Sequence, residues 1–380
     1  MASAAHPAHT PQTLDDAPVS GVCHALFAYD IGLTTDLAAV ARSLGESTAR
    51  QVVRQRRRAP KWFDYEPAPL RVTLRAEPLD VAGFRTEATV DCTLYDFGAA
   101  SVAYRLPVEA RSFADLPALS AGLYDNAALL ADSRARIESL LELIRHCVAK
   151  PGVGALEEDY VVIALHEWGA GSPEAFLDKR RDLAARLLEA EDGPLSAQQV
   201  AESLGARLSF TPHDLAVIDW HGALLFDPGA DDVLAVLEHV NVELLEMRML
   251  DDRLDGVLER AHDLLARQSR ASLWPRPSGA AALRELADLQ ADSSLLFEGV
   301  NNAIKLLGDQ YLARLYRLAA QRLHLPAWDA SVLRKIDSAE SIYQKIAGFQ
   351  STRRMEVLEI VIVVLILVSI LLPFVGLSGH

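Results

Sequence analysis

The sequence predicts an α+β protein: an N-terminal mixed α/β head, a long antiparallel helical coiled-coil stalk, and one C-terminal transmembrane helix. Strand-like and helix-like runs alternate up to about residue 229, whereas the following stretch is helical almost throughout. Near the end, 18 consecutive residues carry no charge. We therefore expect four segments: a disordered leader, the head, the stalk and a tail anchor, at residues 1–20, 21–229, 230–355 and 356–380.

The head is expected to contain strands separated by helices. Apolar or alternating runs predict strands at 22–31, 70–76, 88–95, 99–106 and 160–165. Helical periodicity predicts helices at 35–44 and 123–149, and two more within 172–206 that break at Asp192-Gly193-Pro194. A hairpin is predicted from Leu215–Trp220 and Ala223–Phe226, turning near His221-Gly222.

The stalk is predicted from apolar residues that recur at three- and four-residue steps, as in a coiled coil. In the first helix they are Leu237, Val240, Leu244, Met247, Leu254, Leu258, Ala261 and Leu265, and only Asp251 interrupts them. We expect this helix, 231–270, to pack against a second at 279–323, and a third to run toward the membrane. The same pattern predicts a homo-oligomer formed through these helices; it leaves open whether they pair within one chain or between chains.

The uncharged run at 360–377 is long enough as a helix to cross a bilayer. Arg353 and Arg354 precede it, so the positive-inside rule predicts a single-pass protein with its bulk in the cytoplasm and its C-terminus outside. Glu356 and Glu359 fall at the membrane-entry turn. We expect residues 356–377 to contact lipid in a bacterial inner (cytoplasmic) membrane, because the N-terminus has neither a secretory signal nor a transit peptide.

Composition limits the function classes. The formal net charge of −15 argues against a protein that coats nucleic acid in bulk. The three cysteines are widely spaced, which predicts neither a disulfide framework nor a cysteine zinc site. The sequence has no phosphate-binding glycine loop, no nucleophile elbow and no HExxH pair. In the hairpin region, spacing fixes no third metal ligand beside Asp219 and His221, so we expect turn chemistry at Asp214 and Asp227. No enzyme activity, cofactor, metal or small-molecule substrate is therefore predicted.

One basic cluster stands out in the acidic chain, and aromatic residues follow it. Such a cluster can hold phosphates while bases stack on the rings, which makes it a candidate RNA or ribosome contact. The alternative is a solvated loop whose aromatic side chains pack on the core. The candidate residues are Arg54, Arg56, Arg57, Arg58, Lys61 and Trp62.

Residues 300–370 resemble the C-terminal signature of the "required for meiotic nuclear division" family, also called YagE-like. The matching positions are Asp309, Tyr311, Arg314, Tyr316, Trp328 and Tyr343, followed by an Arg-Arg-Met-x-x-Leu-Glu entry to a terminal apolar helix. One departure is Ile360, where the family usually has Trp. The resemblance implies a membrane-anchored, non-enzymatic factor; mitochondrial members are linked to translation and fungal ones to meiotic division.

Taken with the stalk, the resemblance predicts a membrane-anchored cytoplasmic scaffold or adaptor. It would self-associate through its helices and tether the translation machinery or another client to the membrane. Two alternatives stay open: a membrane-attached enzyme with an unrecognised site in the head, and an RNA-binding protein that uses the cluster between Arg54 and Tyr65.

Overall fold

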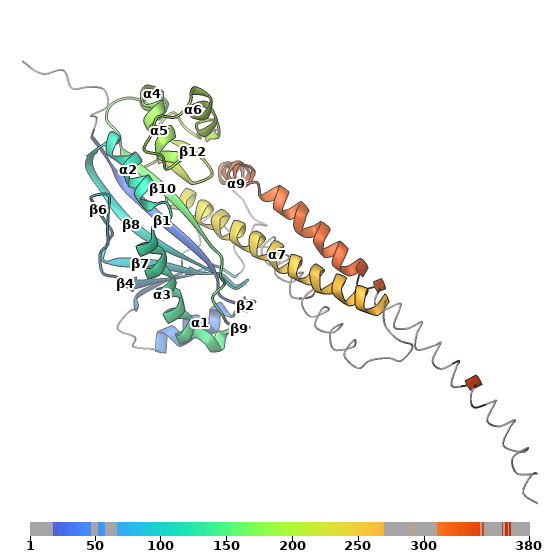
Figure 1. Ribbon diagram of the computed structural model, residues 1–380. Helices are drawn as coiled ribbons and strands as arrows, with labels where there is room; N and C mark the ends of the chain where they lie inside the picture. Colours follow the sequence, from blue (N-terminus) through green and yellow to red (C-terminus); the bar gives the residue numbers. More distant parts are fainter. Residues whose placement is uncertain are drawn as a thin grey trace, which may run out of the picture. The chain divides into compact units, whose positions relative to one another are not determined.

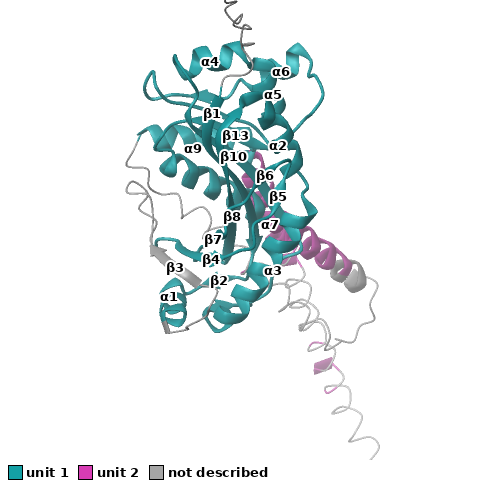
Figure 2. Ribbon diagram, turned by 90° about the vertical axis from the view of Figure 1, so that its left-hand side faces the viewer, with its two compact units in different colours: residues 1–246, 299–326 teal, residues 247–298, 327–380 magenta. Residues whose placement is uncertain are grey.

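The computed structural model describes residues 18–46, 52–57, 67–269 and 310–342, with the isolated positions 291, 344, 345, 359, 362, 363 and 365. The chain divides into two compact units (Figure 2). The first unit comprises residues 1–246 and 299–326, and the second comprises residues 247–298 and 327–380. In the described residues the first unit is a mixed α/β structure and the second is helical.

A large sheet organises the first unit (Figure 1). Among the described residues it has nine strands in the order β11-β12-β13-β10-β1-β8-β7-β4-β3. All neighbours are antiparallel except β10 and β13. The strands are β1 (Pro18–Asp30), β3 (Val52–Arg57), β4 (Leu70–Arg75), β7 (Thr89–Leu94), β8 (Ala99–Ser112), β10 (Glu157–Glu167), β11 (Arg207–Leu208), β12 (Leu215–Ile218) and β13 (Gly222–Phe226).

Two short ribbons lie outside this sheet. They pair β2 (Thr34–Thr35) with β9 (Val148–Ala149), and β5 (Asp80–Val81) with β6 (Phe84–Arg85). Close backbone approach fixes the turn before β8, where Gly98 has φ of +89° and a Cβ would lie 2.1 Å from the Gly32 carbonyl oxygen. Only glycine fits there without strain.

One face of the sheet is apolar and helices cover it. Phe27 and Tyr29 of β1 point to this side and are about 1% exposed. Helix α3 packs on β1 and β8, and its first turn is capped by Asn126, whose side chain accepts from the Leu129 amide. The helices of this layer are α1 (Leu37–Glu46), α2 (Leu116–Leu123), α3 (Ala127–Ile144), α4 (Pro173–Lys179), α5 (Arg181–Leu188) and α6 (Ala197–Ser203).

Several sequence predictions are confirmed at this level. The predicted hairpin is the antiparallel pair β12 and β13, and the strands predicted at 88–95 and 99–106 pair as β7 and β8. The apolar stripe of the predicted helix at 123–149 is buried along α3. The cysteines Cys23, Cys92 and Cys147 are free and buried.

Helix α7 (Asp231–Ser269) is where the predicted architecture differs most from the structure. Residues 236–247 are buried at every position, which covers more than three helical turns on all sides. A stalk helix would instead bury a narrow stripe and expose the remainder. Residues 236–246 therefore form a buried part of the first unit, whose boundary with the second unit lies within α7 after residue 246.

Contacts within the first unit hold this part of α7 on two sides. The Asn241 amide donates to the Glu158 carbonyl oxygen of β10 at 3.2 Å. The Tyr316 hydroxyl of α9 (Gln310–Arg322) donates to the Glu243 carboxylate at 2.9 Å. The sheet and α9 thus enclose the helix.

In the second unit, the later part of α7 pairs with helical residues 327–342. Lys335 Nζ lies 2.8 Å from Asp251 Oδ1 and 2.6 Å from Asp255 Oδ1, and the Ser331 hydroxyl donates to Asp251. Asp251, which interrupts the predicted seam, is therefore ion-paired. Much of the partner helix expected at 279–323 lies outside the described residues.

The predicted membrane anchor is not supported. Within the described ranges, no helix combines the length and apolar character needed to cross a membrane. The run at 360–377 falls outside the described residues except for Ile362, Val363 and Leu365. An apolar run shows composition alone, whereas crossing requires a continuous helix of about 20 residues.

The fold class predicted from the sequence, with its terminal transmembrane helix, is thus wrong and is replaced by a mixed α/β structure with a large sheet. The same finding contradicts the predicted tail-anchored, single-pass topology and the predicted inner-membrane location. The lipid contact expected at 356–377 and the membrane-entry roles of four residues stay predictions, and of these four only Glu359 is described. They are Arg353, Arg354, Glu356 and Glu359.

Candidate functional site: a polar cavity beneath helix α7

The second face of the sheet, toward α7, carries charged and polar side chains. His24 of β1 lies opposite Arg105 of β8, and Asp91 of β7 lies opposite Ala103 of β8 and Thr73 of β4. Strand alternation sends these residues to the face opposite Phe27 and Tyr29. Small residues such as Ala103 separate the polar ones, which lets a helix approach while leaving space.

This space is a cavity of about 560 Å³ within the first unit. Its sheet wall comes from β1, β4, β7, β8 and β10, and its other wall comes from residues 227–238, at the end of β13 and the start of α7. The ionisable residues that line it are His24, Arg71, Asp91, Arg105, His166, Asp227, Asp231, Asp232 and Glu238.

An ion pair joins the two walls. Arg71 Nη2 of β4 lies 3.0 Å from Glu238 Oε2 of α7, and the glutamate side chain is 3% exposed. The pKa of Arg71 is raised, chiefly by this carboxylate. Arg71 Nε and Glu238 Oε1 are both buried and find no hydrogen-bond partner among the described residues. The pair thus presents one donor and one acceptor that are not satisfied.

His24 is a neutral base at physiological pH. Burial, followed by the charges of Arg105 and Arg71, lowers its pKa to about 3. No hydrogen bond joins its ring to another residue in the described part of the chain. A neutral imidazole offers one donor and one acceptor nitrogen.

The remaining carboxylates of the cavity lining differ in their hydrogen-bond partners. Asp91 accepts a hydrogen bond from the Thr73 hydroxyl at 2.6 Å, and Asp227 accepts from the Gly229 amide at 2.8 Å. Asp231 and Asp232 occupy the first turn of α7, where the positive end of the helix dipole favours them. Asp227 and Asp214, which accepts from the amides of Phe210 and Thr211, confirm the turn chemistry predicted from the sequence.

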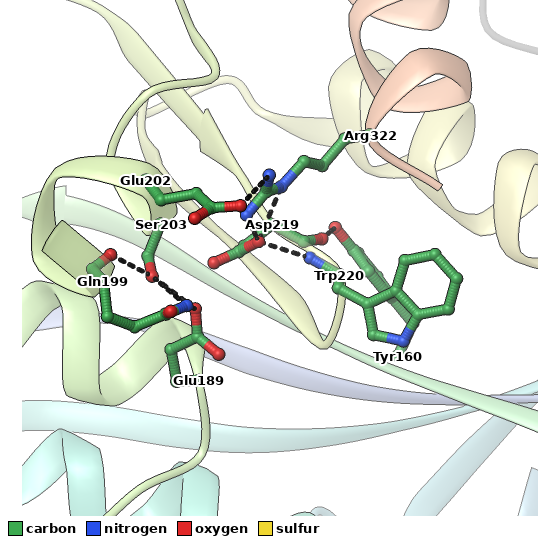
Figure 3. A network of polar contacts seen from close by, with 8 residues as sticks. All are labelled: Tyr160, Glu189, Gln199, Glu202, Ser203, Asp219, Trp220 and Arg322. Carbon is green, nitrogen blue, oxygen red and sulfur yellow. Dashed lines mark hydrogen bonds and ion pairs between the residues drawn. The ribbon is translucent and has the colours of Figure 1, made fainter. Parts of the chain in front are cut away.

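A second polar cluster surrounds Asp219 and is shown in Figure 3. Asp219 is 1% exposed; its carboxylate accepts from Arg322 Nε of α9 at 2.7 Å and from the Trp220 amide at 2.7 Å. The Tyr160 hydroxyl donates to its carbonyl oxygen at 2.9 Å. Burial raises the pKa of Asp219 even though Arg322 opposes the shift.

Glu189, which follows α5, faces the same cluster (Figure 3). Burial opposes ionisation, but hydrogen bonds from Ser203 and Gln199 outweigh it and lower the pKa of Glu189. The Glu189 carboxylate accepts from Gln199 Nε2 at 2.6 Å and also from the Ser203 hydroxyl. Asp219 Oδ2 is buried and finds no hydrogen-bond partner among the described residues. The other groups bond one another and join α5, α6, β12 and α9, so we regard the cluster as structural.

The described residues that line the cavity include none of the basic cluster predicted to contact RNA. Arg54, Arg56 and Arg57 belong to β3, whose side chains lie outside the described set. Arg58, Lys61 and Trp62 lie outside the described residues altogether. The RNA or ribosome contact therefore stays a prediction.

The residues of the predicted family signature do not converge on one site. Tyr316 bonds Glu243, Tyr311 lies with its ring 5.6 Å from that of Phe210, and Arg314 is exposed. Trp328 is half-buried in the second unit, and Asp309 and Tyr343 lie outside the described residues. In the described part of the first unit these tyrosines serve packing and hydrogen bonding.

Sequence reasoning missed the cavity residues, because the polar positions of β1, β4, β7 and β8 look like the solvent side of half-buried strands. A signal was present in α7, where Glu238, His239, Asn241, Glu243 and Glu246 interrupt an apolar run and are all buried. Buried polar residues at this density indicate that a polar surface packs against the helix. The described residues contain no group of three or more His, Cys, Asp or Glu arranged to hold a metal ion.

Comparison with known proteins gives a different family from the one the sequence resembled. A family model described as "Uncharacterized protein MJ0711, N-terminal domain" matches residues 20–232. A Methanocaldococcus jannaschii protein, described as "Uncharacterized protein MJ0711", is 23% identical over 221 residues, which is 57% of this chain and 65% of the relative. The chain thus spans less than two thirds of that relative. No solved structure matches.

These matches overturn the resemblance to the meiotic nuclear division family. That resemblance rested mainly on residues 300–370, where the described Tyr316 bonds Glu243 within the first unit. The matched region instead covers the sheet and ends at the first turn of α7, so it includes the cavity lining except Leu234, Ala235 and Glu238. Because the family model matches more than half of the chain, this protein belongs to the MJ0711 N-terminal domain family.

Proposed function

We propose that this protein binds a small polar molecule in the cavity between the sheet and the first half of α7. The observation that supports this proposal is the set of ionisable side chains that line the cavity from both walls, among them His24, whose ring has no hydrogen-bond partner among the described residues. The cavity volume of about 560 Å³ falls within the range of small-molecule sites, roughly 300–1,000 Å³.

The energetic cost of this lining favours a binding role over a purely structural one. A buried polar atom without a partner costs about 1–3 kcal/mol, and an apolar pair of similar volume would avoid that cost. His24 lines the cavity without a hydrogen-bond partner among the described residues, and a ligand could satisfy its ring nitrogens. The lining is thus suited to a bound state.

The binding role replaces the membrane scaffold as the main proposal. Self-association through helices, an adaptor role, contact with RNA and an enzyme activity in the first unit stay predictions. A cavity with a neutral histidine and several carboxylates is compatible with catalysis, but a binding role requires fewer assumptions.

A cavity-filling variant tests this proposal. Ala103→Leu places a larger apolar side chain at the sheet wall, and Glu109→Leu on the exposed end of the same strand is its matched control. The purified proteins are screened by thermal unfolding against small amines, carboxylates and phosphates. A ligand at 100 times its Kd adds about 2.7 kcal/mol to the free energy of unfolding.

We expect at least one class of compound to raise the melting temperature of the wild type and of Glu109→Leu, but not that of folded Ala103→Leu. Circular dichroism confirms that each variant folds. Equal stabilisation of all three proteins would place binding elsewhere and reject the cavity as the site. No stabilisation of the wild type by any class would reject the binding role.

A further inference from the structure

The cluster around Asp219 brings two carboxyl groups and one arginine together inside the first unit (Figure 3). We propose that Asp219 and Glu189 share a single proton, as a carboxylic acid bonded to a carboxylate, and that this acid pair fastens α9 to α5 and α6 in a pH-dependent way. Neither acid lines the cavity beneath α7, so the pair would hold its proton whether or not that cavity binds a ligand.

The two oxygens of the Asp219 carboxyl group have different surroundings. Oδ1 accepts from Arg322 Nε and from the Trp220 amide, both at 2.7 Å. Oδ2 is buried and finds no donor in the described part of the chain. In Figure 3 the side chains of Asp219 and Glu189 point toward one another. Two ionised carboxylates only accept hydrogen bonds, so the two acids can bond each other only if one of them carries a proton.

Charge balance within the cluster also requires one proton. In the described part of the chain, Arg322 is the only cation ion-paired with either carboxyl group. One guanidinium balances one buried negative charge, whereas two ionised acids would leave an unbalanced charge in a site that is almost closed to water. If folding takes up one proton from solvent, the cluster contains one cation and one carboxylate.

The hydrogen bonds of the two acids place this proton on Asp219. Glu189 is half-buried, and its carboxylate accepts from Gln199 Nε2 at 2.6 Å and from the Ser203 hydroxyl. These bonds and the one with Asp219 lower the pKa of Glu189 although burial opposes the shift. Burial raises the pKa of Asp219, and the charge of Glu189 adds to the rise. Asp219 is therefore the acid that donates, and Glu189 is the ionised acceptor.

The elements packed around the pair contribute few other charges. The Glu202 carboxylate lies 4.0 Å from Arg322 Nη1, but its side chain is 57% exposed and therefore well screened by water. The Tyr160 hydroxyl is occupied by the Asp219 carbonyl oxygen. The titratable or charged groups that face the pair are Arg322 of α9, Glu202 of α6, Tyr160 of β10 and His221 beside the turn.

The shared proton makes the attachment of α9 sensitive to pH. When the pH rises through the pKa of Asp219, its hydrogen bond to Glu189 is lost and two like charges face each other. The pKa of Asp219 is higher in the folded chain than in the unfolded one, so the free energy of unfolding falls as the pH rises through this range. Arg322, which carries the contact to α9, then has to balance two carboxylates.

Two variants of the full-length protein test the proposal. Asp219→Asn introduces a neutral amide that can donate to Glu189 at every pH, so it copies the protonated acid. Glu189→Gln removes the like charge, so Asp219 should ionise beside Arg322. Glu191→Gln removes an exposed carboxylate two residues away and is the matched control. Carbon-13 NMR of labelled aspartate carboxyl groups follows the ionisation of Asp219, and melting temperatures are measured at pH 6 and pH 8.

We expect the Asp219 carboxyl signal at the position of a protonated acid at pH 6, about two units above the pKa of an exposed carboxyl group. Glu191→Gln should leave this signal unchanged, and Glu189→Gln should shift it to the position of a carboxylate. The melting temperatures of the wild type and of Glu191→Gln should fall more between pH 6 and pH 8 than that of Asp219→Asn.

An ionised Asp219 at pH 6 in the wild type would overturn the proposal, because no proton would then be shared. So would a signal that stays at the protonated position in Glu189→Gln, since burial alone would then hold the proton. The Asp219 signal is assigned through its backbone resonances, so both results can be obtained even if Asp219→Asn does not fold. An equal fall in melting temperature for wild type and folded Asp219→Asn would overturn the pH-dependent attachment.

Discussion

The Arg71–Glu238 pair allows a quantitative test of why the polar layer exists. Replacing Arg71 alone with methionine keeps an aliphatic stem but leaves a 3% exposed carboxylate without its cation. Breaking a buried pair in this way costs about 3–5 kcal/mol. Because the Arg71 side chain is 24% exposed and water can reach part of the site, we expect a loss near the lower end, about 3 kcal/mol.

The double variant Arg71→Met/Glu238→Leu removes both charges. Apolar replacement of a buried pair is neutral or stabilising by about 1–4 kcal/mol. We therefore expect the free energy of unfolding of the double variant to equal that of the wild type within about 1 kcal/mol, or to exceed it. The coupling free energy between the two positions is then at least about 2 kcal/mol.

Urea unfolding at pH 7, followed by circular dichroism, measures these differences. The matched control is Arg145→Met, which removes an exposed ion pair with Glu142 whose side chains are 56% and 71% exposed. We expect this control to change stability by less than about 1 kcal/mol. A double variant as unstable as Arg71→Met would refute the reasoning, because the pair would then stabilise the fold by itself.

Three further predictions concern the first unit. Burial lowers the pKa of His24 from 6.5 to about 3. Between these two pH values the unfolded chain binds a proton at His24 and the folded chain does not. The free energy of unfolding therefore falls as the pH decreases, by up to about 1.4 kcal/mol per pH unit. Urea unfolding at several pH values should show that the free energy of unfolding of His24→Asn decreases less with falling pH than that of the wild type. Identical slopes for the two proteins would contradict this. Arg322→Met leaves Asp219 buried without its cation, and since burial raises the pKa of that carboxyl, the loss of stability should be larger at pH 8 than at pH 5; equal losses would argue against it. Phe27→Ala empties a site that is 1% exposed and lies 5.8 Å from the Tyr104 ring, so unfolding should become easier by about 3–5 kcal/mol; a calorimetric change below about 1 kcal/mol would show that Phe27 is not in the core.

Local structure could be predicted where the sequence pattern is short-range. The β12–β13 hairpin follows from two apolar runs around His221-Gly222, and α3 follows from its periodic leucines and the Asn126 cap. Turn chemistry at Asp214 and Asp227 needs only neighbouring amides. In each case the interacting groups lie within a few residues of one another.

The position of α7 could not be predicted, because its three- and four-residue periodicity fits a coiled coil and an interior helix equally well. What decides is the polar face of the sheet, with Arg71 reaching Glu238 across 167 residues of sequence. The same long-range pairing creates the cavity, so the candidate site could not be predicted from the sequence either. The spanning helix predicted from the apolar run at 360–377 is not supported, because no described helix is long and apolar enough to cross a membrane.

Hydrogen–deuterium exchange with mass spectrometry would test the central claim, that the space beneath α7 is a ligand site. The protein is compared with and without a saturating concentration of the compound that raises its melting temperature most in the thermal-unfolding screen. We predict slower exchange in peptides that contain His24, Asp91, Arg105 and residues 231–238, with little change around Asp219. Protection confined to other regions, with these peptides unchanged, would contradict the account.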